Sequence, residues 1–335
     1  MRLISIISCT AALFFSAAAA FAQPNCKLQP SQTLMLYPEG QNSDKGLEGA
    51  QGPIVSNGYT ADMEVMNDKG NIGKIGDNAR IDLYFPKKPN GQMVVVCPGG
   101  GYSIVSSWNE GVYVADWMLE RGITVCVVKY RLPNYHWEIP LQDVQNAFRY
   151  CRAHAAEWGV NQIGVMGFSA GGHLAASATN LYVDNVTRPD FSILIYPVIS
   201  MDHKITHKGT RNQLIGKDEK WDNKDVTVKE YEAAQKKKAE LVERYTMDMQ
   251  VTENTPVTFI AHCTDDKTVQ IENTVRYYRE LVAHKVPAEV HIYPTGGHGW
   301  GFSSEKFKGK GNDKFAYARE EFYNSLDRWL EGLKK

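Results

Sequence analysis

The sequence predicts an α/β fold, in which a mostly parallel β-sheet carries helices on both of its faces. Short apolar runs, typical of strands that are buried on both faces, recur along the chain from about residue 80. Helical patterns of a dozen or more residues separate many of these runs, and this alternation is typical of a parallel sheet. Residues 201–253 are polar and interrupt the alternation, which predicts an insert, or a small cap, between two strands.

We expect the elements to follow one another along the chain in this alternating order. The predicted strands are Arg80–Pro86, Gly91–Cys97, Ile123–Val128, Ile163–Met166, Phe191–Ile199, Thr255–Ala261 and Ala288–Tyr293. The predicted helices are Ser107–Gly122, Pro140–Trp158, a run of small residues after Ser169, Gln270–Lys285 and Lys314–Leu333. Within the insert, Val228–Arg244 predicts a solvated helix, and we interpret the run Lys236–Lys238 as part of its wet face.

The N-terminal part of the chain divides into a leader and an extension. Arg2, an apolar Ala-rich run and Ala20-Phe21-Ala22 predict that residues 1–22 are a cleaved signal peptide. A retained membrane helix is the alternative, but interrupting Ser and Thr residues and the small-residue end favour cleavage. We therefore expect a protein that is periplasmic or secreted, with no membrane span in its mature chain. Residues 23–79 predict irregular chain and edge strands that pack on a main domain, residues 80–335.

Charge and cysteine content exclude some classes of protein. The formal net charge is −1, which gives no reason to expect nucleic acid or an anionic membrane as a partner. Removal of Cys9 with the leader leaves an odd number of cysteines, and the sequence has no C-x-x-C motif. We interpret them mainly as small buried hydrophobes, with a single disulfide as the alternative. These cysteines are Cys26, Cys97, Cys126, Cys151 and Cys263.

A nucleophile motif lies at the centre of the predicted sheet. Gly167-Phe168-Ser169-Ala170-Gly171 matches G-x-S-x-G, and it follows an apolar run and precedes a helical one. This strand–turn–helix context is the one in which a strained turn holds a serine hydroxyl above the sheet. A Gly/Ser turn without chemistry is the alternative, because the motif alone is short enough to occur by chance. Whether Ser169 is a nucleophile therefore depends on the residues that follow the other predicted strands.

A run of glycines follows the strand that ends at Cys97. Pro98-Gly99-Gly100-Gly101-Tyr102 lets the backbone pass close to a ligand and turn its N–H groups toward it. We predict that Gly100 and Gly101, together with the Ala170 N–H, form an oxyanion hole, with an uncertainty of one position in the glycine run. A phosphate-binding loop is the weaker alternative, because no Lys follows and the G-x-G-x-x-G spacing is absent.

An acid and a base follow two later strands. Asp265 and Asp266 both come after the strand that ends near His262. We favour Asp266, because it lies three residues before Val269 and so resembles the D-x-x-V pattern of hydrolases. Asp265 could instead brace the turn. His298 stands between two glycines after the last strand, where an imidazole can reach both a serine and a carboxylate.

The other histidines lack this setting. His173 follows the serine turn into a helix and is interpreted as a packed helix residue rather than a base. His203 and His207 have the i, i+4 spacing of a metal-binding pair, but they lie in the polar insert without a matching carboxylate motif. The sequence therefore predicts neither a metal site nor an organic cofactor.

The order Ser169, Asp266, His298 is the order of the α/β-hydrolase triad. The chain resembles α/β-hydrolase esterases of the branch that includes bacterial acetylxylan and feruloyl esterases, which is related to dienelactone hydrolases and prolyl-oligopeptidase-type catalytic domains. The resemblance covers about residue 80 to the C-terminus, with Pro98 at the position of the histidine in HGGG-type loops. The segment from Trp221 to about Lys238 is longer than this family leads one to expect. The motifs that carry the resemblance are Pro98–Tyr102, Glu110-Gly111, Tyr130-Arg131-Leu132, Gly167–His173, Tyr196–Ser200, Asp265-Asp266 and Gly297-His298-Gly299.

The resemblance implies a serine esterase that works through an acyl-enzyme, without a cofactor, on an acylated carbohydrate. Together with the predicted export, it favours removal of O-acetyl groups from a plant polysaccharide such as xylan. A feruloyl esterase, an exopeptidase of the prolyl-oligopeptidase type and a catalytically inactive binding module are the alternatives. Tyr102, Trp108 and Trp300 flank the predicted site, and each is either part of a sugar-stacking wall or a packing residue. The sequence leaves the oligomeric state open.

Overall fold

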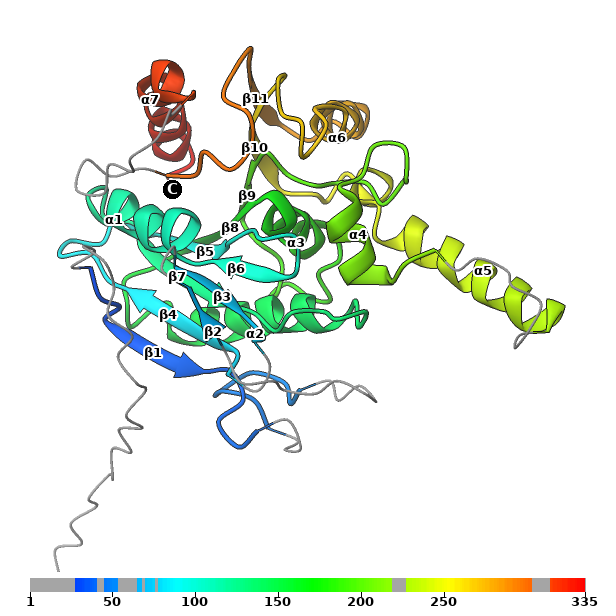
Figure 1. Ribbon diagram of the computed structural model, residues 1–335. Coiled ribbons are helices and arrows are strands. Elements are labelled where there is room, and N and C mark those ends of the chain that lie inside the picture. The colour runs from blue at the N-terminus through cyan, green and yellow to red at the C-terminus, as the bar shows by residue number, and fades with distance from the viewer. Residues whose placement is uncertain are drawn as a thin grey trace, which may run out of the picture.

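A central sheet of eight strands carries the fold (Figure 1). The computed structural model describes residues 28–40, 45–53, 65–67, 70–75, 78–218, 227–302 and 314–334. The six strands from β7 to β11 in spatial order are parallel, whereas β4 and β1 add antiparallel pairs at one edge. The predicted mostly parallel sheet is thereby confirmed. In spatial order the strands are β1 (Gln32–Met35), β4 (Arg80–Tyr84), β7 (Thr124–Lys129), β5 (Gln92–Cys97), β8 (Gln162–Phe168), β9 (Phe191–Ile195), β10 (Val257–Cys263) and β11 (Ala288–Tyr293).

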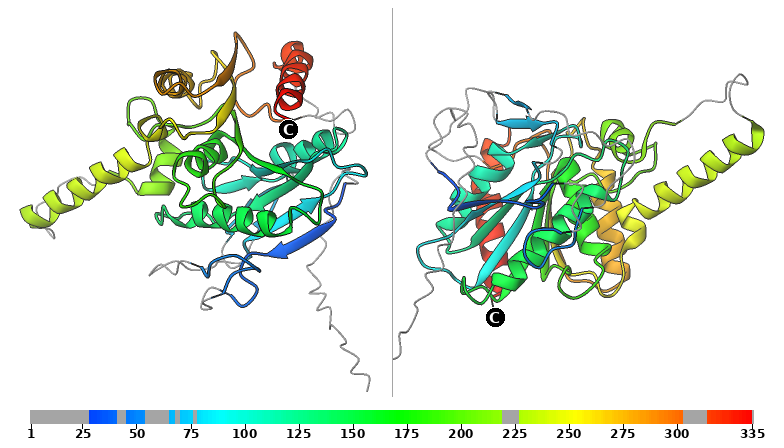
Figure 2. Two further views of the ribbon diagram at one scale, coloured as in Figure 1. Left: turned by 180° about the vertical axis from the view of Figure 1, so that it is seen from behind. Right: turned by 90° about the horizontal axis from the view of Figure 1, so that it is seen from below.

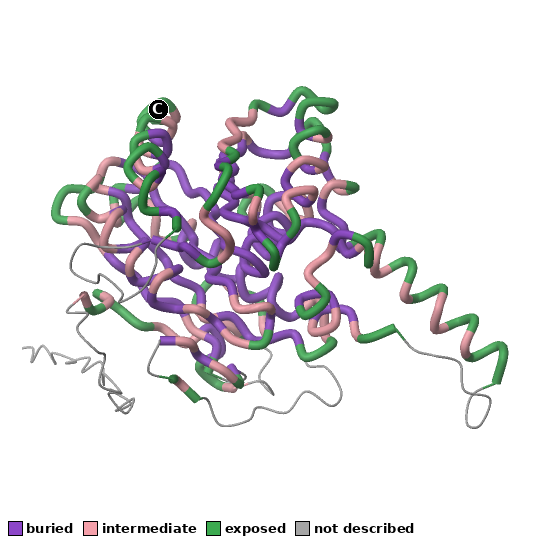
Figure 3. The backbone as a smooth tube through the Cα atoms, turned by 45° about the horizontal axis from the view of Figure 1, so that its top comes forward, coloured by how far each residue is buried: buried purple, intermediate pink, exposed green. Residues whose placement is uncertain are grey.

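Helices cover both faces of this sheet (Figure 2). On one face, α2 (Ile139–His154), α3 (Ser169–Asn180) and α6 (Glu272–Ala283) contribute to one apolar cluster. On the other face, α1 (Tyr113–Leu119) and α7 (Ala316–Gly332) contribute to a second cluster. Side chains of β5 alternate between the two clusters, so the strand is buried throughout, as are most of the inner strands in Figure 3. Each fully buried valine of this kind stabilises the fold by about 1.5–3 kcal/mol.

The observed bounds differ from the predicted ones at two instructive places. The predicted helix Ser107–Gly122 begins as a π-helix, η1 (Trp108–Val112), and only then continues as α1. π-helical turns are rare and are frequently found at functional sites. The strand predicted within Phe191–Ile199 is expected to end at Pro197, but it ends at Ile195, because Tyr196 has a φ of 36° and turns the chain away from the sheet. Both departures lie at the carboxyl end of the sheet.

The extension before residue 80 is attached to the main domain in several ways. Strand β1 pairs with β4 at the edge of the central sheet. Strands β2 (Val65–Met66) and β3 (Asn71–Gly73) join β6 (Ile104–Ser106) in a separate three-stranded sheet. Tyr37 donates a hydrogen bond to Asp143 at 2.6 Å, and Asp143 also forms a fully buried ion pair with Arg131 at 2.7 Å. The extension is therefore anchored by side-chain contacts as well as by strand pairing.

The described part of the insert, residues 201–218 and 227–253, contains two helices and one short turn. Helix α4 (Lys208–Ile215) contacts α5 (Val228–Arg244), which has no buried residue and projects away from the molecule (Figures 1 and 2). A 3-10 turn, η2 (Met247–Gln250), leads back to β10. The interpretation of Lys236–Lys238 as a wet face is wrong for Lys238: its ammonium donates to the Ile215 carbonyl at 2.7 Å and also to the Gly216 carbonyl. This lysine binds the C-terminal carbonyls of α4, which favour a cation.

The structure describes four of the cysteines but not the predicted leader. Cys97, Cys126, Cys151 and Cys263 are buried and free, as expected for small hydrophobes, whereas Cys26 lies outside the described residues. The predicted signal peptide, residues 1–22, also lies outside them. Within the described ranges, none of the helices combines the length and the apolar composition needed to cross a bilayer.

Candidate active site

The turn between β8 and α3 holds Ser169 in a strained conformation. Its φ is 53°, in the left-handed region that an L-residue adopts only when its surroundings enforce it. The turn is tight: a Cβ atom on Gly167 would lie 2.1 Å from the Gly171 carbonyl oxygen, and one on Gly171 would lie 2.1 Å from the Cys97 carbonyl oxygen. Only glycine fits at these two positions, which explains the G-x-S-x-G spacing. The hydroxyl is thereby raised at the carboxyl edge of the sheet.

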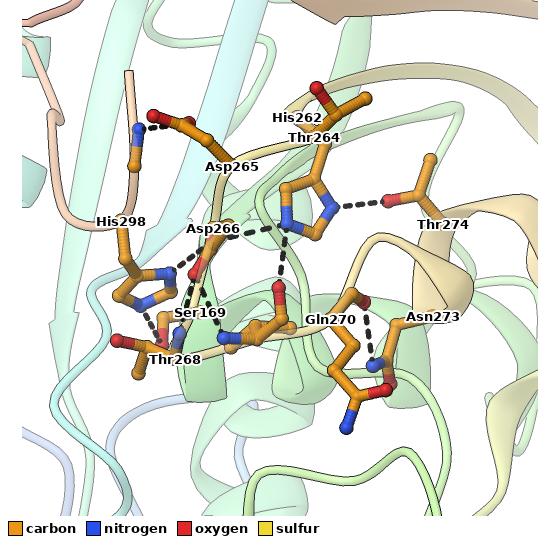
Figure 4. Close-up of polar contacts among 12 residues, drawn as sticks. Ser169, His262, Thr264, Asp265, Asp266, Thr268, Gln270, Asn273, Thr274 and His298 are labelled. Carbon is orange, nitrogen blue, oxygen red and sulfur yellow. Dashed lines mark hydrogen bonds and ion pairs between the residues drawn. The ribbon is translucent and has the colours of Figure 1, made fainter. Parts of the chain in front are cut away.

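Ser169, His298 and Asp266 form one hydrogen-bonded chain (Figure 4). The Ser169 Oγ lies 2.8 Å from His298 Nε2, and His298 Nδ1 lies 2.7 Å from Asp266 Oδ2. Because a carboxylate only accepts hydrogen bonds, we assign the proton of the neutral ring to Nδ1, which leaves Nε2 to accept the serine proton. The structure thus brings together three residues that are up to 129 positions apart.

Asp266 is held as a carboxylate by several donors. Its Oδ1 accepts the backbone N–H groups of Thr268 at 2.8 Å and Val269 at 2.9 Å. Its Oδ2 is shared by His298 and by the buried His262, whose Nε2 lies 3.1 Å away (Figure 4). Burial alone would raise the pKa of the Asp266 carboxyl, but the hydrogen bonds from His262 and His298 outweigh burial and hold this pKa far below its usual range.

The N–H groups of the glycine loop are not equivalent. The Gly99 N–H donates to the buried Glu110 carboxylate at 2.7 Å, so it is already committed. Gly100 and Gly101 have φ values of 131° and 65°, and their N–H groups have no hydrogen-bond acceptor among the described residues. Ala170 is the second residue of α3, where backbone N–H groups have no acceptor within the helix. The three predicted oxyanion donors are thus the amides that remain available around Ser169.

The three aromatic candidates for a sugar-stacking wall are packing residues. Tyr102 is 1% exposed, and its hydroxyl bonds the His173 ring at 3.0 Å. Trp108 is 7% exposed and packs directly on Gly70, where a Cβ would lie 2.0 Å from the indole. Trp300 is 8% exposed and stacks on Phe315 with 3.9 Å between ring centroids. The stacking alternative is therefore wrong, because none of these rings presents an open face to a sugar.

Helix α3 places His173 as predicted. Its ring is fully buried between the Tyr102 hydroxyl and the Tyr245 carbonyl, which lies 2.8 Å from Nε2. Burial lowers the pKa of His173 to about 4, with the hydrogen bond to the Tyr245 carbonyl opposing the shift. This histidine is consequently neutral at physiological pH and lies outside the Ser169 chain.

His203 and His207 do not form a pair. His203 is exposed, with 74% of its side chain accessible. His207 instead caps α4: its Nδ1 accepts the Thr210 N–H at 3.2 Å, which leaves the ring proton on Nε2. In the parts of the chain that the structure describes, no cluster of three or more His, Cys, Asp or Glu side chains could hold a metal ion.

Further residues near the site, His207, Glu110 and Tyr196 among them, were given no role in it by the sequence. The ring of His207 faces the glycine loop: its Cε1 lies 3.6 Å from the position of a Cβ on Gly101. Glu110 binds the Gly99 N–H, and the Tyr196 ring lies 4.8 Å, centroid to centroid, from the His298 ring. Glu110 and Tyr196 fall within motifs that carry the family resemblance, whereas no pattern in the sequence indicates the position of His207.

Comparisons with known proteins agree with this geometry. A family model described as alpha/beta hydrolase fold matches residues 94–302. An acetylxylan esterase from Xylanibacter ruminicola is 34% identical over 259 residues, which cover 76% of this chain and 48% of that protein. Endo-1,4-beta-xylanase B from Butyrivibrio fibrisolvens is 29% identical over 232 residues, which cover 64% of this chain and 33% of that protein. The chain thus spans less than half the length of these two relatives.

Solved structures provide a second comparison. An acetyl ester-xyloside bifunctional hydrolase from Caldicellulosiruptor lactoaceticus has a TM-score of 0.68 at 26% identity, and the match covers 92% of this chain and 98% of that one. A sugar hydrolase from Lactococcus lactis has a TM-score of 0.61 at 28% identity, with 77% and 95% covered. The family match extends over more than half of the sequence and includes Ser169, Asp266 and His298. The chain belongs to the alpha/beta hydrolase fold family.

Proposed function

We propose that the protein is a serine carboxylic-ester hydrolase that removes O-acetyl groups from a plant polysaccharide such as xylan. The observation that carries the proposal is the continuous hydrogen-bonded chain from Asp266 through His298 to Ser169, with distances of 2.7 and 2.8 Å. This is the arrangement of a serine nucleophile with its general base and the acid that orients the base. The presence of all three side chains argues against an inactive binding module.

The roles of the residues follow from their geometry. His298 takes the proton of Ser169 while the oxygen attacks the ester carbonyl, and the carboxylate of Asp266 stabilises the imidazolium that forms. The N–H groups of Gly100, Gly101 and Ala170 stabilise the oxyanion, a type of contribution worth about 2.7–4 kcal/mol per donor. His298 then gives its proton to the leaving alcohol. In the second half of the reaction it activates the water that releases the acid from Ser169.

The acetyl and carbohydrate assignments rest on two kinds of support. The relatives described above include an acetylxylan esterase and an acetyl ester-xyloside bifunctional hydrolase. In this chain, the His207 ring lies beside the glycine loop, with its Cε1 atom 3.6 Å from the position of a Cβ on Gly101. We expect a ring at this position to leave more room for an acetyl group than for a feruloyl group.

The nucleophile is tested by Ser169→Ala with a fluorophosphonate probe and p-nitrophenyl acetate. We expect the wild-type chain to be labelled and to show a burst of nitrophenol. The variant should lose the label, the burst and turnover. A variant that keeps substantial esterase activity would overturn the assignment of Ser169.

The substrate is tested by comparing the release of two acids. Acetate is measured from acetylated xylo-oligosaccharides, and ferulate is measured from feruloylated arabinoxylan fragments. We expect kcat/KM to be higher for acetate release. A higher value for ferulate would establish the feruloyl esterase instead, and cleavage of a prolyl-p-nitroanilide peptide would establish an exopeptidase.

We also propose that the protein is exported with removal of residues 1–22. The support is the sequence pattern, which consists of Arg2, an apolar Ala-rich run and Ala20-Phe21-Ala22. The mass of the protein recovered from the periplasm or medium of an expressing bacterium tests the cleavage site. Retention of the full-length chain in the cytoplasm would overturn this proposal.

A further inference from the structure

A buried carboxylate connects the two loops that flank Ser169. Glu110 is 4% exposed and lies in the π-helix η1. Its Oε2 accepts the Gly99 N–H at 2.7 Å, and its Oε1 accepts the Tyr196 hydroxyl proton at 2.8 Å. Both carboxylate oxygens are therefore bound by neutral donors, one of which immediately precedes the oxyanion residues Gly100 and Gly101.

The connection continues from Tyr196 to the histidine loop. The Tyr196 oxygen accepts the Gly301 N–H at 2.9 Å, three residues after His298. The Tyr196 ring lies 4.8 Å from the His298 ring, centroid to centroid, and meets it at 59°. Beside this contact, the Phe302 N–H donates to the Asn109 carbonyl at 2.9 Å. Residues 109 and 110 of η1 thus hold the loop that carries His298 through two separate links.

Glu110 is buried between these two loops without a charged partner among the described residues, and this is rare for a carboxylate. Burying it costs free energy, and burial raises the pKa of Glu110, while the hydrogen bonds from Tyr196 and Gly99 and the proximity of His298 oppose this rise. In return, a charged acceptor forms shorter and stronger hydrogen bonds than a neutral one, so it fixes both donors more firmly.

We propose that Glu110 is a positioning residue that fixes the glycine loop and the His298 loop relative to each other across Ser169. This role rests on the proposed function, because it concerns the distance between oxyanion donors and the general base. The two groups act on the same tetrahedral centre, and a displacement of about 1 Å in such an arrangement can reduce the rate about a hundredfold. Tyr196 relays the position of the carboxylate to Gly301.

The test uses Glu110→Gln, Glu110→Ala and Tyr196→Phe. Glutamine keeps one acceptor oxygen, alanine keeps none, and phenylalanine removes only the hydroxyl that joins Glu110 to Gly301. Tyr277→Phe is the matched control, since Tyr277 is a fully buried tyrosine whose hydroxyl accepts a single hydrogen bond, from Asn180 at 2.8 Å, elsewhere in the fold. The readouts are kcat and KM for p-nitrophenyl acetate, the second-order rate of fluorophosphonate labelling, and Tm.

We expect Glu110→Gln and Tyr196→Phe each to lower kcat and the labelling rate about tenfold, with KM changed less than about threefold. The double variant should lose little more than either single variant, because both changes break the same link. Glu110→Ala should lose more than Glu110→Gln. Tyr277→Phe should lower Tm and leave kcat unchanged. If the alanine variant fails to fold, Glu110→Gln and Tyr196→Phe carry the test.

Two outcomes would overturn the proposal in distinguishable ways. In the first, the wild-type chain reacts with ester and probe, and Glu110→Gln and Tyr196→Phe lower Tm but keep kcat within twofold. This result assigns Glu110 a purely structural role. A wild-type chain that neither hydrolyses the ester nor reacts with the probe overturns the proposed function, and this role for Glu110 falls with it.

Discussion

Asp265 and Asp266 are adjacent in sequence, yet they hold two different parts of the same loop. Asp266 Oδ2 lies 2.7 Å from the Nδ1 atom of His298, whereas Asp265 Oδ1 accepts the backbone N–H of Gly297 at 2.7 Å (Figure 4). One carboxylate therefore orients the imidazole, and its neighbour fixes the turn from which that imidazole extends.

This division predicts unequal effects of two matched substitutions. Asp266→Asn removes the charge that orients and stabilises the His298 imidazolium, and we expect kcat to fall about 10⁴-fold, as for other triads. Asp265→Asn keeps an oxygen that can accept the Gly297 N–H, so we expect a loss of about tenfold or less. Initial rates with p-nitrophenyl acetate measure both losses of kcat. The rates are normalised to fluorophosphonate-reactive sites in the wild type and to folded protein in the variants. Equal losses would contradict the division.

The strain at Ser169 predicts different stabilities for two inactive variants. Ser169 has a φ of 53°, and glycine adopts this conformation without a steric cost, whereas alanine does not. We expect Ser169→Gly to be more stable than Ser169→Ala by about 1 kcal/mol, after the added entropy of glycine in the unfolded chain is taken into account. Urea unfolding of the two inactive variants measures this difference. A less stable glycine variant would show that the turn is not strained.

The position of His207 predicts a change of selectivity. His207→Asn keeps an oxygen that can cap α4 but removes the ring beside Gly101, so we expect more room beside the glycine loop while the helix keeps its N-cap. We expect the ratio of kcat/KM for p-nitrophenyl butyrate to that for the acetate to rise severalfold, with Tm nearly unchanged. His203→Asn, at an exposed position of the same insert, is the control and should leave the ratio as it is. An unchanged ratio in His207→Asn would place the acyl group elsewhere.

The burial of His173 predicts a pH-dependent stability. Its pKa is lowered to about 4 in the folded protein, while the unfolded chain has a histidine pKa of about 6.5, so the unfolded state binds the proton more readily between these values. The contribution of His173 to the free energy of unfolding is therefore complete above about pH 6.5. It is lost as the pH falls toward about 4, and the loss is roughly 3 kcal/mol at most.

Urea unfolding between pH 4.5 and 7.5 measures this contribution. His173→Gln should have a lower free energy of unfolding at neutral pH, because its contacts with Tyr102 and the Tyr245 carbonyl are altered. It should nevertheless lose less stability on acidification than the wild type does. Parallel pH profiles in the two proteins would show that the His173 proton equilibrium does not change on folding.

Much of the candidate site could be predicted because its determinants are local. The strain at Ser169 requires Gly167 and Gly171 within two residues on either side, so the turn is visible in a short stretch of sequence. The parallel sheet then places every strand end at one edge. For that reason a serine, an acid and a base that follow separate strands could be expected to meet.

Side-chain exposure, in contrast, is decided by tertiary packing. Tyr102, Trp108 and Trp300 flank the loops of the site as predicted, but their rings turn inward onto His173, Gly70 and Phe315. The local sequence around an aromatic residue does not indicate whether its ring faces a ligand or the core. Only the neighbours supplied by other parts of the chain decide between these orientations.

The sheet, the strained turn at Ser169 and the order of the three triad residues can be predicted from the sequence, because strand period, turn sterics and chain order are properties of neighbouring residues. The sequence pattern favours Asp266 as the acid, but the separate contacts of Asp265 and Asp266 depend on the tertiary structure, as does the hydrogen bond between Glu110 and Tyr196 across 86 positions. The physical reason is that a hydrogen bond requires two groups to approach within about 3 Å. The packing of the whole domain, which no single segment encodes, sets such distances between remote residues.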